Sequence, residues 1–332
     1  MPRRPAQLLL SSIVWLVNQP ATLGAENLPP PIESSAGQEV FNLLPKSFQK
    51  NPLVDQTVIT EMTEEGKKLI PPSREKPAYY VAESTGFHME GHGPVDSILP
   101  AAADLEQSVQ RALAVNDYQP AGPGHPASLM IVYHWGLHTN LNDASADIAD
   151  PAFPDVRHRN LLSRATLVGG SKFAAELKTA LDQQDREDEV KSTLPAEFGS
   201  MLSTYGPLRR FSDRDPRTRQ LYEESRGDCY FAIVSAYDYN AAVHGQRKLL
   251  WRSKMTVDAQ GVAMTDTLPG LIANAGRYFG RDMPVAATIA KRINRETQTR
   301  LGPLEVKEYL DSPAPTIAPK KPEPAPNAPA QP

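Results

Sequence analysis

Cysteine is nearly absent from this chain, with Cys229 the single example among 332 residues. An intramolecular disulfide is therefore excluded, whatever the cellular compartment. Cys229 begins an apolar run that continues through Tyr230 and Phe231, so we expect it to be a small buried residue. Pairing with a second molecule and a reactive thiol are the alternatives.

The chain also lacks an excess of positive charge and, after its first 25 residues, any long hydrophobic run. It has 35 Lys and Arg against 39 Asp and Glu, a net charge of −4. Loss of residues 1–25 would remove Arg3 and Arg4 and leave 33 basic against 39 acidic residues, a net charge of −6. A mildly acidic chain without a basic stripe has no electrostatic reason to bind nucleic acid. No later window approaches 18 apolar residues, so we expect no membrane span.

Residues 1–25 are typical of a cleavable signal peptide. Arg3 and Arg4 precede the apolar residues 8–17, Pro20 follows, and Ala25 is the best cleavage position. Ten apolar residues extend about 15 Å as a helix, half the thickness of a bilayer core. We therefore expect a periplasmic or secreted protein without a lipid anchor. The alternative is an amino-terminal helix that packs into the body of the protein.

Proline is abundant, with 32 examples, about twice the usual ~5%, and it is concentrated outside the predicted domain. The polar lead segment, residues 26–76, contains prolines at 29–31 and 71–72. From Pro313 onward the chain is rich in Pro and Ala without apolar periodicity. Such a segment buries too little surface to offset the entropy of ordering, so residues 311–332 are expected to be a disordered tail.

Between these ends, residues 77–300 have the pattern of one α/β domain. The branched and aromatic residues 78–83 predict a strand, the spacing of Leu105, Val109 and Leu113 predicts a helix, and residues 128–135 predict a strand covered on both faces. This order is a βαβ unit with a parallel strand pair. We expect a single mixed, mostly parallel sheet flanked by helices.

The second half of the domain predicts a late β-hairpin and further helices. Residues 230–237 form a third apolar strand, and residues 248–257 alternate like a half-exposed strand paired with it. The remaining expectations are a helix over 161–184 broken at Gly169 and Gly170, a loop over 204–227, and helices over 268–279 and 285–300.

This order of elements, together with Leu250, Trp251 and Arg252 in the late strand, resembles a recurring envelope domain. It is similar to the amino-terminal domain of TolB and to the core of the curli-secretion lipoprotein, over residues 77–280. The resemblance implies an envelope assembly or binding module rather than an enzyme, and it implies no catalytic residue. Many such proteins are lipoproteins, whereas this chain has no cysteine near the cleavage position.

Histidine supplies the one candidate for a chemical site. His88 and His92 follow the first strand, and the pair His134 and His138 begins at the end of the second. If these strands and the third are parallel, both pairs lie at the carboxyl edge of the sheet and Asp238 joins them there. We therefore consider a divalent transition-metal site formed by two or three of these histidines with Glu90 or Asp238. The alternative is that the histidines are exposed loop residues, with His134 packed.

Other motifs indicate no chemistry. Asp213–Pro216 lacks the glycine and the final carboxylate of a calcium loop, and Gly169–Lys172 lacks the first glycine of a phosphate loop. No Gly-x-Ser-x-Gly elbow is present. We favour a non-enzymatic module that binds another envelope component. A metal-dependent hydrolase and a structural spacer are the alternatives, and the sequence indicates no oligomeric state.

Overall fold

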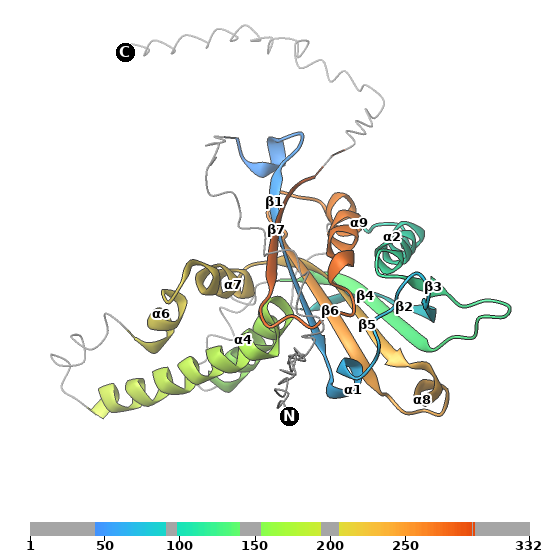
Figure 1. Cartoon of the computed structure of the whole chain (residues 1–332). Coiled ribbons are helices and arrows are strands. Elements are labelled where there is room, and N and C mark those ends of the chain that lie inside the picture. Colours follow the sequence, from blue (N-terminus) through green and yellow to red (C-terminus); the bar gives the residue numbers. More distant parts are fainter. Residues whose placement is uncertain (1–43, 91–97, 140–153, 194–205, 294, 296–332) are drawn as a thin grey trace, which may run out of the picture. The chain divides into compact units, whose positions relative to one another are not determined.

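The computed structural model describes residues 44–90, 98–139, 154–193, 206–293 and 295 (Figure 1). The predicted signal peptide, the predicted tail and His92 lie outside these residues, so their assignments stay predictions. None of the described helices has both the length and the apolar composition that a bilayer span requires.

The described strands form one seven-stranded sheet in the order β3-β2-β4-β5-β6-β1-β7. Only β2 pairs in parallel, with β3 on one side and β4 on the other; the other four strand pairs are antiparallel. The strands are β1 (Leu53–Met62), β2 (Ala78–Glu90), β3 (Tyr118–Pro120), β4 (Leu129–His138), β5 (Cys229–Asp238), β6 (Leu249–Asp258) and β7 (Ala287–Arg292).

The expectation of a mostly parallel sheet is therefore wrong, although a single mixed sheet with flanking helices is confirmed. After the long connection that follows β4, the chain re-enters the sheet beside the last residue of β4. His138 at the end of β4 pairs with Cys229 at the start of β5. From that position β5 can only run back along β4. The hairpin β5–β6 and the strand β1 beside it continue the antiparallel arrangement.

The βαβ unit and the hairpin form as the sequence predicts. The helix α2 (Ala102–Ala114) connects β2 to the parallel strand β4, and its residues Leu105, Val109 and Leu113 are fully buried. The helix α9 (Met264–Ala275) packs against β5 and β6, and α2 packs against α9 (Figure 1). These two helices cover one face of the sheet.

The long helix α4 (Pro154–Thr193) packs against β1 and β6 on the other face, where Leu167 contacts Phe231 of β5. Gly170 breaks it, as predicted, with a φ of 85° that favours glycine. The break is held by Glu61 of β1, whose carboxylate accepts hydrogen bonds from the backbone N–H of Ser171, at 2.7 Å, and from the Ser171 hydroxyl. Glu61 also binds the ammonium group of Lys254, at 2.7 Å.

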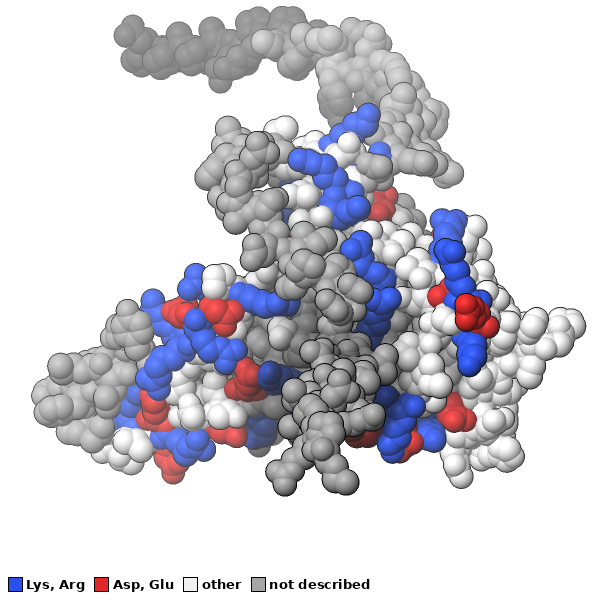
Figure 2. Space-filling model, viewed as in Figure 1, with Lys and Arg blue, Asp and Glu red and all other residues white. Residues whose placement is uncertain are grey.

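Two helices occupy the segment 204–227, for which the sequence predicts a loop. They are α6 (Pro207–Ser212) and α7 (Pro216–Arg226), and each begins with a proline at a position where its missing N–H costs nothing. Ion pairs from Arg210 to Glu187 and from Arg214 to Glu176 connect this region to α4. Figure 2 shows the resulting mixture of both charge signs over this side of the domain.

Three further expectations differ from the structure. The lead segment contributes β1, which lies between β6 and β7 inside the sheet. Residues 287–292 form the edge strand β7 rather than part of a helix. The strand β6 is mostly buried rather than half-exposed, because α9 and α4 pack against it and β1 pairs with its outer edge. The short helices are η1 (Lys46–Phe48), α1 (Glu64–Lys67), α8 (Tyr239–Val243) and η2 (Gly276–Tyr278).

Candidate functional site: a pocket at the edge of the sheet

Two of the predicted metal ligands, His88 and His134, are neighbours on adjacent strands. Their rings meet edge to face, with centroids 4.9 Å apart. His88 lies inside β2, which extends to Glu90, rather than in the predicted loop. Burial lowers the pKa of His134 to about 4, with further contributions from His88 and from the charge of Arg252. His134 is therefore a neutral, partly packed ring at physiological pH.

His138 is separate from this pair and has the environment of a structural residue. Its side chain is buried, and its Nε2 atom lies 3.3 Å from a carboxylate oxygen of Glu90. Burial and the charge of Arg164 lower the pKa of His138 to about 4. At neutral pH the ring is thus uncharged and its contact with Glu90 is not an ion pair, while its Nδ1 atom lies 3.4 Å from the Thr139 backbone oxygen.

Asp238 lies at the opposite end of the strands from His138. It pairs with Leu129, nine residues before His138 on β4, which corresponds to about 30 Å along a strand. The prediction that Asp238 joins the histidines depends on a parallel β5 and is wrong because β5 is antiparallel. Among the described residues no three His, Cys, Asp or Glu side chains are grouped to hold a metal ion. Nothing in the described geometry favours a metal-dependent hydrolase.

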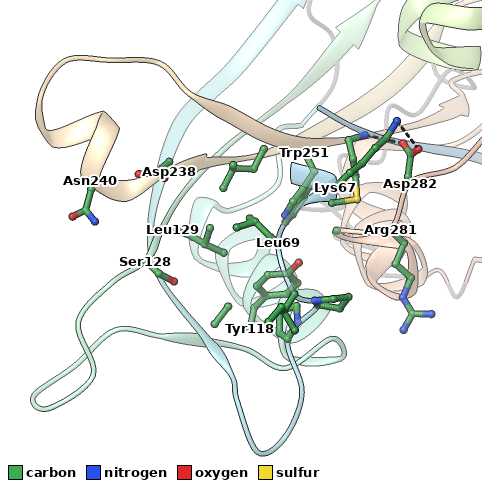
Figure 3. Close-up of a pocket in the computed structure, with 17 residues that line it drawn as sticks. Lys67, Leu69, Tyr118, Ser128, Leu129, Asp238, Asn240, Trp251, Arg281 and Asp282 are labelled. Atoms are coloured by element: carbon green, nitrogen blue, oxygen red, sulfur yellow. Dashed lines mark hydrogen bonds and ion pairs between the residues drawn. The ribbon is translucent and has the colours of Figure 1, made fainter. Parts of the chain in front are cut away.

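The edge of the sheet that carries Asp238 contains a large pocket, which we term the edge pocket (Figure 3). Its volume of about 920 Å³ is at the upper end of the range for small-molecule sites. The ends of six strands, β1 to β6, meet there. The lining residues are Met62, Lys67, Leu69, Ile70, Pro71, Pro72, Ala78, Tyr118, Ser128, Leu129, Asp238, Asn240, Leu250, Trp251, Gly280, Arg281 and Asp282.

Aromatic side chains form the inner wall of the edge pocket. The Trp251 ring lies between those of Tyr118 and Phe279, with centroid distances of 5.8 and 5.7 Å. The Trp251 indole hydrogen-bonds the Tyr118 phenol, but burial dominates and raises the pKa of Tyr118 to about 12. The phenol is therefore a neutral group in the wall, and it neither accepts nor releases a proton at physiological pH.

Gly280 permits this packing. Its φ is +68°, and a Cβ atom at this position would collide with the Tyr118 hydroxyl. We expect Gly280→Ala to lower the free energy of unfolding by about 2 kcal/mol, through the left-handed backbone and the displaced phenol. Gly270→Ala is the matched control, because Gly270 lies inside α9 with open space around it, and there alanine should stabilise the protein slightly.

Urea unfolding of the two glycine variants measures both effects. A Gly280→Ala protein as stable as the wild type would show that the backbone at Gly280 does not pack against Tyr118 as described.

The polar groups of the edge pocket lie at its periphery. The Lys67 ammonium is paired with Glu64, at 3.2 Å, and with Asp282, at 3.3 Å. Asp238 caps α8 by accepting a hydrogen bond from the N–H of Ala241, at 2.9 Å. The Arg281 guanidinium donates to the Asn116 side-chain oxygen, at 3.2 Å. In Figure 3, Arg281 and Asp238 are at opposite sides of the pocket.

No known protein family and no curated protein matches this chain. The similarity to TolB and to the curli-secretion lipoprotein therefore stays a prediction. The site must be interpreted from its own geometry, which consists of apolar and aromatic walls with satisfied charges near the mouth.

A second, smaller hollow of about 510 Å³ lies near the opposite end of β6. Most of its lining side chains are acidic or polar, and Glu224 of α7 is one of them. Each oxygen of this carboxylate accepts a hydrogen bond, at 2.7 Å from Thr57 and at 2.5 Å from Thr256. These bonds attach α7 to β1 and β6, so the hollow has a structural explanation.

Proposed function

We propose that this chain is a non-enzymatic binding or assembly module of the cell envelope, and that the edge pocket receives the apolar part of its ligand or partner. The observation that carries this proposal is the pocket itself, with about 920 Å³ of space and mainly apolar walls. Pockets of this size and composition are the usual binding sites of folded domains. The placement in the envelope comes from the predicted signal peptide at residues 1–25.

The rim of the edge pocket supports a binding role. Leu69 and Ile70 expose 49% and 83% of their surfaces beside the opening, and adjacent exposed apolar residues of this kind mark contact sites. The pocket lining in the described residues includes no His or Cys. The Ser128 hydroxyl donates to the backbone oxygen of Tyr79 rather than to the side-chain base that an activated nucleophile requires.

Fluorescence of the neutral probe N-phenyl-1-naphthylamine tests this proposal. We expect saturable binding to the wild-type protein and about tenfold weaker binding to Leu69→Ser/Ile70→Ser, because an apolar side chain buried by a ligand contributes about 1.5 kcal/mol or more. Both residues are already exposed, so the fold should tolerate the change.

Ile98→Ser is the matched control, since Ile98 is 82% exposed but does not line the edge pocket. It should bind the probe like the wild type. Equal binding by all three proteins would place the probe elsewhere, and absence of saturable binding to the wild type would refute the proposed function.

A further inference from the structure

The two basic side chains that line the edge pocket, Lys67 and Arg281, differ in whether a carboxylate neutralises their charge. Of the two cations in its lining, Lys67 lies within 3.3 Å of two carboxylates. Arg281 has no carboxylate within ion-pair distance among the described residues, and its guanidinium hydrogen-bonds the neutral side chain of Asn116 instead. Among the described residues, the positive charge of Arg281 at the rim of the edge pocket therefore has no counter-ion.

The two carboxylates of the lining are already used. Asp282 accepts a hydrogen bond from the backbone N–H of Met62, at 3.0 Å, and pairs with Lys67. Asp238 caps α8. A ligand in the pocket thus meets apolar walls, and among the described lining residues the charge left without a carboxylate is that of Arg281, whose guanidinium extends outward at the mouth (Figure 3).

We infer that the edge pocket binds an acidic amphiphile, a long-chain carboxylic acid whose hydrocarbon chain lies against Trp251 and Leu250 and whose carboxylate pairs with Arg281. This inference rests on the proposed function and specifies the ligand of that site. Arginine suits the role because its planar fork of donors matches the two oxygens of a carboxylate. The guanidinium keeps three or more N–H groups for this contact beyond the one that Asn116 receives.

Displacement of N-phenyl-1-naphthylamine by three ligands of one chain length tests the inference. The ligands are dodecanoic acid, dodecan-1-ol and dodecylamine, used at neutral pH below the concentrations at which any of them aggregates or separates from solution. We expect the acid to bind about tenfold more tightly than the alcohol, as one charge-assisted hydrogen-bonded pair allows. The amine should bind most weakly.

Two arginine variants identify the group responsible. Arg281→Gln should weaken the acid about tenfold and leave the alcohol unchanged, so the alcohol reports that the pocket is still folded. Arg277→Gln is the matched control, because Arg277 is exposed on η2 and does not line the pocket. It should bind all three ligands like the wild type.

The possible failures separate this inference from the proposed function. If the probe binds but the alcohol or the amine competes as well as the acid, the ligand class is wrong and the pocket remains a binding site. If the acid is preferred and Arg281→Gln does not change that preference, the assignment of Arg281 is overturned. If the probe does not bind, the proposed function fails.

Discussion

Glu61→Ala is expected to lower the free energy of unfolding by about 3–5 kcal/mol. Lys254 is only 7% exposed on the sheet face beneath α4, and Glu61 is its counter-ion at 2.7 Å. Removal of Glu61 leaves a buried ammonium group with the Thr166 backbone oxygen as its remaining hydrogen-bond acceptor. The substitution also removes the acceptor that holds Ser171 at the break in α4.

Urea unfolding monitored by circular dichroism measures this loss. Glu65→Ala is the matched control, since Glu65 also pairs with a lysine, Lys68 at 3.1 Å, but in an exposed position. Exposed pairs of this kind contribute little, and this variant should unfold like the wild type. If Glu61→Ala were equally harmless, Lys254 would not be buried against Glu61, and α4 would not be fastened to the sheet at that point.

The stability of the protein should also depend on the protonation of Glu224. Burial raises the pKa of this carboxyl from 4.5 to about 7, with contributions from Asp258 and Asp55, although its bonds from Thr256 and Thr57 act in the opposite direction. In the folded protein Glu224 thus stays protonated at pH values at which it ionises in the unfolded chain. The folded state binds the proton more tightly, so this stabilisation is complete below pH 4.5 and is lost as the pH rises through 7. The shift corresponds to about 3 kcal/mol.

Glu224→Gln should remove this dependence, because the amide keeps the shape and hydrogen bonds of the protonated acid. His134 and His138 have pKa values lowered to about 4. Their effect on stability is opposite to that of Glu224, since they favour folding increasingly as the pH rises from 4 to 6.5. The informative quantity is therefore the difference in unfolding free energy between the wild type and Glu224→Gln. It should shift by about 2.5 kcal/mol in favour of the variant between pH 5 and pH 8.

Glu223→Gln, at an exposed neighbouring position, serves as the control and should show no such shift. If the free energy of unfolding of the wild type had the same pH dependence as that of Glu224→Gln, Glu224 would be ionised and solvated in the folded state.

Much of the sheet could be predicted from the sequence because burial on both faces leaves a clear local signal. The apolar residues of β4 and β5 were recognisable for this reason, and α2 was recognisable from its single apolar stripe. β1 gave no such signal, because several of its buried residues are polar. Thr60 shares a hydrogen bond with Ser253, at 2.6 Å, and Gln56 accepts one from Asn274, at 2.9 Å. These partners lie about 200 residues away, and only the folded protein brings them together.

The candidate site was less predictable because it depends on strand direction and on distant segments. The apolar pattern of β5 is the same whichever way the strand runs, so the sequence could not show that Asp238 and His138 lie at opposite ends. The edge pocket is built from segments as far apart as Met62 and Asp282. Pro71 and Pro72 belong to the predicted polar lead segment and Trp251 supports only the family resemblance, so no local signal pointed to this pocket.

The indole N–H resonances of the protein provide the most direct test of binding in the edge pocket. Trp251 forms its inner wall, whereas Trp135 lies six residues beyond the lining residue Leu129 on β4, about 20 Å along the strand. On titration with N-phenyl-1-naphthylamine, nuclear magnetic resonance should show a saturable shift of the Trp251 indole signal and an unchanged Trp135 signal. A shift of Trp135 alone, or of neither signal, would contradict a ligand site at this edge of the sheet.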